Sequence, residues 1–253
     1  MTDVRYETRA GAAWITINRP EARNALNKAV REGLERAFTD AEADPEVAVV
    51  VLTGAGDKAF CAGGDLKEMA DVSLMIPPPD YVPQPNRTIA MSKPVIAAVN
   101  GGAFGGGFLL AQSADLVIAA EHAKFGISEI KIGRGAPWAA PLPWLIPPRI
   151  AMQMLVTGDP LTARRAYEVG LVNEVAAPSE LLDRTNELVE TIVANAPLSV
   201  RAGKATVYAA AHHTRDEAFA AAEKIWEPVY LSADAQEGPR AFAEKRTPVW
   251  QGR

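Results

Sequence analysis

The stretch KPVIAAVNGGAFGGGFLL (Lys93–Leu110) joins an unbroken apolar run to three consecutive glycines and a second apolar run. The run Val95–Val99 is too short for a helix and is typical of a strand that is covered on both faces. Glycines carry no Cβ, so a backbone rich in them can approach a ligand closely, and the helix that they open adds a positive dipole end. The stretch therefore predicts a strand, a glycine turn and a helix whose first N–H groups can bind a carbonyl oxygen.

A second glycine turn, FCAGGDL (Phe60–Leu66), has the same design. It follows the apolar run Val47–Leu52, and Asp65 with LKEMA after it is typical of a helix start. Neither turn matches the P-loop or the dinucleotide-binding pattern. Two backbone N–H groups that converge on one oxygen form an oxyanion hole, which stabilises an enolate. A tight turn with close packing also explains either glycine cluster alone, so the residues around them must decide.

Short apolar strands alternate with helical patterns over much of the chain. The apolar spacing from Leu26 to Ala41 predicts a helix that ends before Pro45. This alternation predicts an α/β protein with largely parallel sheets, although no sequence repeat is visible. The predicted strands are Val4–Arg9, Trp14–Asn18, Val47–Leu52, Val95–Val99 and Leu116–Ala120.

Two segments differ from this alternation. Five prolines in Ser73–Asn86 predict a loop, which we place over the site. One apolar stripe over Leu181–Val193 predicts a helix, and the residues after Pro197 show helical patterns without a strand. Thr214 and Ser232 are the predicted N-caps there. We expect residues 1–195 to form a core that carries the site and residues 196–253 to form a helical oligomerisation region.

Composition excludes several classes of function. The 253 residues are 48% hydrophobic, enough for one large domain with a small appendage. The net charge is −5 and no basic run exceeds two residues, which argues against nucleic-acid and membrane-surface partners. The uncharged stretch Pro94–Ala114 has five glycines, so it fits a buried strand, loop and helix better than a membrane span.

Cysteine and histidine usage favours a simple cytoplasmic protein. Cys61 is the single cysteine, so no internal disulfide can form and a reducing compartment is favoured. The N-terminal MTDVRYETRAG contains acids and no apolar core, unlike a signal peptide. The three histidines, His122, His212 and His213, show no metal-binding pattern, and we assign them no chemistry.

Five segments, in order, give the chain a resemblance to the crotonase family, the family of enoyl-CoA hydratases and isomerases. The likeness covers nearly the whole chain. The segments are INRPEARNALN (Ile17–Asn27), LTGAGDKAFCAGGDLKEM (Leu52–Met69), KPVIAAVNGGAFGGGFLLAQSADLVIA (Lys93–Ala119), AKFGISEIKIG (Ala123–Gly133) and GLVNEV (Gly170–Val175).

The resemblance implies a crotonase-like spiral of ββα turns with a C-terminal helical trimerisation region. It also implies an acyl-CoA substrate, a homotrimer or a hexamer built from two trimers, and no metal or redox cofactor, since coenzyme A is part of the substrate. By motif position, the N–H groups of Gly64 and Gly106 would hold the thioester oxygen. Contacts to coenzyme A and the acyl chain would come from Arg23, Ala25, Ala62, Gly64, Asp65, Leu66, Gly106, Leu109, Phe242 and Lys245, the last two often from a neighbouring subunit.

The resemblance also identifies the acid–base residues. Hydratases of this family use two glutamates, and this chain has Leu109 at the first position and Glu129 at the second. A lone carboxylate in an apolar pocket has a raised pKa, which suits a proton carrier. On the bare sequence, Glu129 is equally well explained as a surface acid paired with Lys131.

One glutamate favours double-bond isomerisation, because a single group can take a proton and return it two carbons away. Addition of water typically needs two carboxylates. Hydration or dehydration stays open if Asp71, Asp80 or Glu121 enters the site. A non-catalytic acyl-CoA-binding protein also stays open, with Leu109 as the trace of lost turnover.

The segment Gly133–Pro148 departs from the glycine-rich turn that is usual in hydratases. It contains Arg134, Trp138, Trp144 and four prolines up to Pro147. We expect a reshaped acyl pocket in which Arg134 binds a carboxylate on the acyl group; the alternative is a solvated loop arginine.

Overall fold

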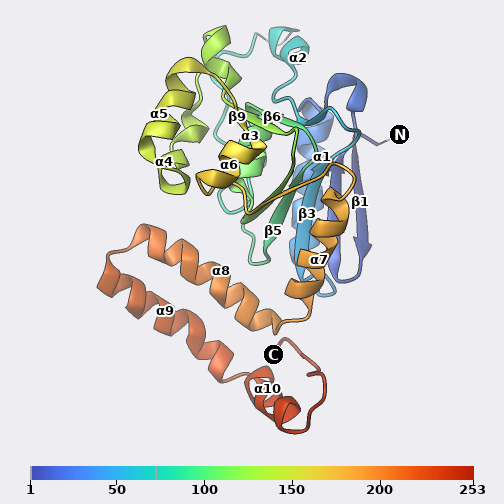
Figure 1. The fold of residues 1–253 in the computed structure, drawn as a ribbon, viewed down its shortest axis with the longest axis vertical. Helices are drawn as coiled ribbons and strands as arrows, with labels where there is room; N and C mark the ends of the chain where they lie inside the picture. The colour runs from blue at the N-terminus through green and yellow to red at the C-terminus, as the bar shows by residue number, and fades with distance from the viewer. Residues whose placement is uncertain (1, 72) are drawn as a thin grey trace.

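Within residues 2–71 and 73–253, which the computed structural model describes, the chain forms a six-stranded and a four-stranded sheet with helices around them (Figure 1). The α/β class predicted from the alternation of short apolar strands and helices is therefore confirmed.

The six-stranded sheet begins with an antiparallel hairpin and continues with parallel strands. Three predicted strands, Val4–Arg9, Val95–Val99 and Leu116–Ala120, are confirmed with the same bounds. The strand predicted at Val47–Leu52 lies at Val49–Gly54 instead. The second strand starts at Ala12 rather than Trp14, because a two-residue turn with positive φ at Ala10 and Gly11 pairs Arg9 directly with Ala12. In sheet order the strands are β1 (Val4–Arg9), β2 (Ala12–Ile17), β3 (Val49–Gly54), β5 (Val95–Val99), β7 (Leu116–Ala120) and β10 (Glu174–Ala176).

The four-stranded sheet consists of strands of two or three residues, which the sequence analysis did not find. Each of its first three strands directly follows a strand of the large sheet, and an α-helix comes next in two cases: β3, β4, α2 (Leu66–Asp71) and β5, β6, α3 (Gly106–Ser113). These ββα turns make the predicted spiral. In sheet order the small strands are β4 (Ala59–Cys61), β6 (Gly102–Phe104), β8 (Lys124–Gly126) and β9 (Leu161–Thr162).

Alternating residues of the large sheet enter two apolar cores. In β3, Val50 and Leu52 face the core that contains α1 (Lys28–Ala43) and α3, whereas Val49 and Val51 face the core that α7 (Leu181–Val193) covers. Figure 1 shows α7 running along the face of this sheet. Burial on both faces explains why the strand is apolar at every position.

The connections around the sheets are mostly short helices. Between β8 and β10, α5 packs against the 3-10 helix η2. The segment Ser73–Asn86 forms no helix, as its prolines predict, and only an isolated bridge at Pro85. The short helices are η1 (Pro20–Ala22), η2 (Ser128–Ile132), η3 (Pro137–Ala139), α4 (Leu142–Leu145), α5 (Pro148–Thr157) and α6 (Ala163–Glu168).

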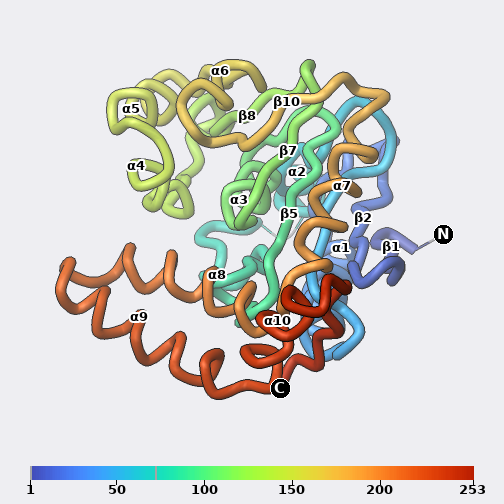
Figure 2. Tube along the Cα trace, turned by 60° about the horizontal axis from the view of Figure 1, so that its bottom comes forward, coloured from blue at the N-terminus to red at the C-terminus, as the bar shows by residue number. Residues whose placement is uncertain are grey.

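Three helices end the chain: α8 (Pro197–His212), α9 (Arg215–Tyr230) and α10 (Ala233–Ala243). Figures 1 and 2 show α8 and α9 side by side, extending away from the sheets. Both predicted N-caps are confirmed, Thr214 through a capping box with Glu217 and Ser232 through a bond from Ala235 N. None of the helices in the described ranges is long and apolar enough to cross a membrane.

Candidate functional site

The two glycine turns touch each other. A Cβ added to Gly63 would lie 3.3 Å from the nitrogen of Gly106, and one added to Gly107 would lie 2.0 Å from the carbonyl oxygen of Cys61. Gly63 and Gly105 also adopt positive φ values of 96° and 52°. Side chains would therefore separate the turns, and glycine is what brings the two predicted donor loops together.

Each predicted oxyanion donor stands at the start of a helix. Gly106 is the first residue of α3, so its N–H has no acceptor within that helix. The preceding N–H, of Gly105, is used by the carbonyl of Gly126 at 3.0 Å. Gly64 pairs with Leu26 in a parallel bridge two residues before α2. The fold thus places Gly64 and Gly106 on adjoining turns, as the resemblance implies.

Asp65 holds the first of these turns in place. Its carboxylate accepts from the backbone N–H groups of Lys67 and Glu68 at 3.2 and 3.4 Å and pairs with Arg19 at 3.1 Å. Burial acts to raise the pKa of Asp65, but the Arg19 guanidinium and these N–H groups outweigh it and hold the pKa below its usual range. The side chain caps α2, so its contribution to a substrate site would be to fix the Gly64 turn.

Glu129 lies directly beside the second turn. It sits in η2, and a Cβ added to Gly105 would be 3.0 Å from Oε1. The indole N–H of Trp138 donates to the same oxygen at 3.0 Å. Oε2 is buried and has no hydrogen-bond partner among the residues that the structure describes. A half-buried carboxylate with one free oxygen is placed where it could exchange a proton with a ligand on the glycine turns.

The surroundings of Glu129 raise the pKa of its carboxyl group, so it binds a proton more tightly than an exposed glutamate does. Burial raises its pKa, against hydrogen bonds from its own backbone and from Trp138 that lower it. Lys131, the partner considered in the sequence analysis, pairs instead with Asp159 at 2.8 Å. The surface ion pair with Lys131 is therefore wrong as an explanation of Glu129.

Leu109 lies in α3, one turn after Gly106, and is 4% exposed within the larger apolar core. The side chains from Gly106 to Ser113 include no acid, so α3 supplies no carboxylate to the site. The three alternative acids, Asp71, Asp80 and Glu121, are exposed.

The proline-rich segment 73–86 covers this region, as expected. Val82 lies 3.5 Å from a Cβ placed on Gly106. The Arg134 guanidinium donates to the carbonyl of Leu74 at 2.7 Å, and the Arg31 guanidinium lies 4.1 Å from the centre of the Tyr81 ring. Arg134 is half-buried and ties η2 to the loop, so it is not the solvated arginine of the alternative explanation. Its predicted contact with an acyl carboxylate stays a prediction.

The residues predicted to bind coenzyme A fall into two groups. Arg23 and Ala62 adjoin, since Ala62 N donates to the carbonyl of Arg23 at 3.0 Å. Ala25 lies in the same segment as Arg23, and the exposed Leu66 lies in the same turn as Ala62. Phe242 is on α10 and is 87% exposed, and Lys245 follows α10. In Figure 1 this helix lies at the opposite end of the molecule from α2. A single chain does not bring these two to the site.

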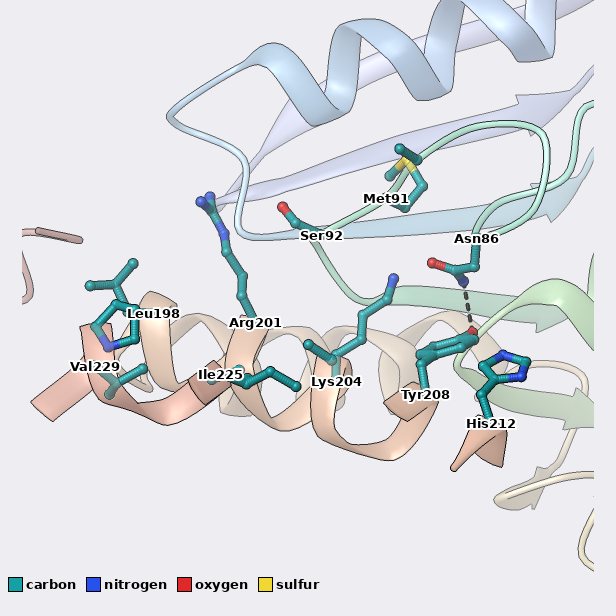
Figure 3. Close-up of a pocket in the computed structure, with 14 residues that line it drawn as sticks. Asn86, Met91, Ser92, Leu198, Arg201, Lys204, Tyr208, His212, Ile225 and Val229 are labelled. Atoms are coloured by element: carbon teal, nitrogen blue, oxygen red, sulfur yellow. Dashed lines mark hydrogen bonds between the residues drawn. The ribbon is translucent and has the colours of Figure 1, made fainter. Parts of the chain in front are cut away.

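A groove of about 570 Å³ lies elsewhere, between α8, α9 and the segment 86–92 (Figure 3). At its wall, Lys204 pairs with Asp115 at 2.9 Å, and Tyr208 donates to Asp115 at 2.9 Å. Asn86 donates to the Tyr208 hydroxyl at 2.8 Å. None of the predicted site residues lines this groove. Its polar network attaches α8 to the sheet.

Two residues near Glu129 had no assigned contact in the sequence analysis. Trp138 was noted there as part of a reshaped pocket, but its bond to Glu129 was not foreseen. Gln112 donates to the Trp138 carbonyl at 2.7 Å, and its own oxygen is buried without a partner in the described ranges. A tryptophan among prolines close after the glutamate was the available signal.

Spiralling ββα turns with two touching glycine turns define a protein of the crotonase class. The family model described as "Enoyl-CoA hydratase/isomerase" matches residues 7–253, and the chain belongs to this family. It is 40% identical to the carnitinyl-CoA dehydratase of Salmonella paratyphi A over 264 aligned residues, 100% of both chains.

Solved structures agree. The chain superposes on an enoyl-CoA hydratase from Mycobacterium tuberculosis H37Rv with a TM-score of 0.92 and 43% identity, covering 100% of both chains. An enoyl-CoA hydratase from Mycobacterium marinum gives 0.91 and 41%, again over 100% of both chains. The crotonase fold is thereby confirmed.

Proposed function

We propose that this protein acts on acyl-CoA thioesters and moves a double bond from the 3-enoyl to the 2-enoyl position. The observation that carries this proposal is the placement of Glu129: half-buried, close to Gly105, and with one oxygen that has no hydrogen-bond partner among residues 2–71 and 73–253. Leu109 stands at the position of the first family glutamate, so the carboxylate of Glu129, at the second position, must serve the reaction alone.

The chemistry needs a donor pair and a single proton carrier. The thioester oxygen would bind to the N–H groups of Gly64 and Gly106. The Glu129 carboxylate takes a proton from C2, and the electron pair of the broken C2–H bond enters a dienolate. Each preformed donor lowers such a barrier by about 3 to 4 kcal/mol. Glu129 then returns the proton to C4, which leaves the double bond between C2 and C3 and restores the carboxylate.

The coenzyme would lie along the adjoining segments around Arg23, Ala25 and Ala62. Arg23 is exposed and cationic, as phosphate recognition requires. Phe242, in α10, and Lys245, just after it, lie at the opposite end of the molecule from α2 (Figure 1), which supports a site shared between neighbouring subunits of a trimer or hexamer. Residues 196–253 would then form the oligomerisation region.

Replacement of the glutamate tests the proposal. A panel of 3-enoyl-CoA thioesters of different chain length is incubated with native protein, and the 2-enoyl products are measured. Glu129→Gln keeps the size of the side chain and removes its ability to take a proton, so we expect kcat to fall by about a thousandfold or more. If the variant keeps full activity on every substrate that the native protein isomerises, the proposal is wrong.

Dehydration of a 3-hydroxyacyl-CoA is the second candidate. The names of the relatives favour it, because the chain is 40% identical to carnitinyl-CoA dehydratases. Adding 3-hydroxyacyl-CoA, carnitinyl-CoA and 2-enoyl-CoA to the panel separates the two reactions. Leu109→Glu supplies the missing carboxylate, so water addition that appears only in this variant supports isomerisation as the native reaction. Native dehydration at a higher kcat/KM than isomerisation would favour the second candidate.

A further inference from the structure

Trp138 connects the helix of the oxyanion turn to the carboxylate of Glu129. Its ring is 9% exposed and packs edge to face on Phe108 of α3, with ring centres 5.7 Å apart. Its backbone carbonyl accepts from Gln112, also in α3, at 2.7 Å. Its indole N–H donates to Oε1 of Glu129 at 3.0 Å. One helix therefore fixes both the Gly106 donor and the indole that touches the carboxylate.

We propose that Trp138 is a positioning residue that occupies Oε1 of Glu129 and leaves Oε2 as the oxygen that exchanges the proton with the substrate. This inference rests on the proposed function, which makes Glu129 the proton carrier. Indole nitrogen is a donor only, so it bonds to a carboxylate oxygen whether or not the other oxygen holds a proton. It also fixes the direction of the carboxylate, which has no other side-chain donor in the described part of the chain.

Gln112 has a place in the same arrangement. Its Nε2 holds the Trp138 carbonyl, while its Oε1 is buried and unpartnered within the described ranges. A buried amide oxygen without a donor is unfavourable. The hydrogen bond from Nε2 to the Trp138 carbonyl offsets this cost, and it keeps the short helix η3 against α3.

Among the described residues, no charged group is a cause of the shift in the pKa of Glu129. The elements α3 and η3 carry no titratable side chain. On η2, Lys131 is paired with Asp159. After η2, the half-buried Arg134 bonds to the Leu74 carbonyl. On α5, Arg149 is exposed. The indole is therefore the side chain that opposes the effect of burial on the pKa of Glu129.

Trp138→Phe tests the inference, because it keeps an aromatic ring against Phe108 and removes the N–H. Without that donor the carboxylate is harder to form, so the acid limb of the pH profile of kcat/KM should move to higher pH. We expect kcat/KM near pH 5 to fall by about tenfold or more, and the loss to narrow toward pH 8. Trp144→Phe is the matched control, since Trp144 is 71% exposed and packs against His212. Coincident profiles for native protein and Trp138→Phe overturn the inference.

A second measurement needs no turnover. The indole ¹⁵N–H resonance of Trp138, assigned by its loss in Trp138→Phe, should shift with pH in the substrate-free protein and stay constant in Glu129→Gln. A resonance that ignores the state of Glu129 also overturns the inference. An inactive Glu129→Gln with an unshifted Trp138→Phe profile removes the role of Trp138 alone, whereas a fully active Glu129→Gln removes the proposed function and this role with it.

Discussion

The carboxylate of Glu129 lies against the Cα of Gly105, where an added Cβ would stand 3.0 Å from Oε1. Gly105 directly precedes Gly106, the predicted oxyanion donor. The proposed proton carrier, on η2, therefore touches the backbone turn that carries the proposed donor. A change that shifts this turn will alter both, and four predictions follow from the contacts around it and around α8.

The buried carboxylate should make stability depend on pH. Burial raises the pKa of Glu129, so the folded chain binds the proton more tightly than the unfolded chain does. This contribution to stability is complete below the unfolded pKa and is lost as pH rises through the folded pKa. Glu129→Gln carries no charge, so its melting temperature should exceed that of the native protein at neutral pH, and the difference should shrink in acid. Glu223→Gln on exposed α9 is the control; a difference that grows in acid would contradict the sign.

The contact between the glycine turns predicts that Gly107→Ala is severe. Its Cβ would lie 2.0 Å from the Cys61 carbonyl oxygen, which is backbone and cannot move aside alone. We expect a loss of more than about 4 kcal/mol in urea unfolding, or no folded protein. Gly203→Ala in α8 is the control, since nothing lies within 4 Å of its added Cβ. It should gain about 0.5 to 1 kcal/mol. Equal effects would refute the steric argument.

Asp65 should contribute through two separable interactions. Asp65→Asn keeps a capping oxygen for α2 and loses the ion pair with Arg19, which costs up to about 1 kcal/mol for such a partly exposed pair. Asp65→Ala loses the cap as well, about 1 kcal/mol more. Because the pKa of Asp65 is held low, the ion-pair part is present above the unfolded pKa and disappears as pH falls through the folded one. Chemical unfolding at several pH values measures the stability of both variants. Equal losses in Asp65→Asn and Asp65→Ala would contradict the prediction.

The buried pair Lys204–Asp115 should be costly to break from one side. Both side chains are largely covered, at 8% and 13% exposed. Burial lowers the pKa of Lys204, while Asp115 opposes this. Asp115→Asn leaves the ammonium without its counter-ion, which should cost about 3 to 5 kcal/mol. Adding Lys204→Met should recover part of that loss in a double-mutant cycle. A single Asp115→Asn that unfolds like the native protein would show that the pair does not hold α8.

The sequence predicted those parts of the fold that leave a long apolar pattern. Val95–Val99 and Leu116–Ala120 are apolar throughout because helices or strands cover both faces, and their bounds agree with the structure. The apolar run Val47–Leu52 predicted a strand that the structure places at Val49–Gly54. The small sheet left no pattern, since β6 is three residues long and lies within the glycines. The long connection 73–94 between α2 and β5 also hides the ββα repeat from inspection by eye.

The site was predictable where backbone geometry demands a residue type. Glycine at 63, 105 and 107 is required by positive φ or by close contact, and those positions stand out in the sequence. Partnerships between side chains on separate turns do not stand out. Lys131 pairs with Asp159 rather than with Glu129, and Trp138 bonds to Glu129. Both contacts depend on how η2, η3 and α5 pack.

Cys61 gives the protein a native reporter of motion at the glycine turns. Its thiol is fully buried next to Gly63, and burial raises its pKa to about 12. The thiolate is the form that attacks thiol reagents, so they can modify this residue only when strand β4 separates from α3 and admits water. The rate of labelling at this single cysteine thus counts the openings of the turn pair, and a ligand that bridges the two turns will slow it.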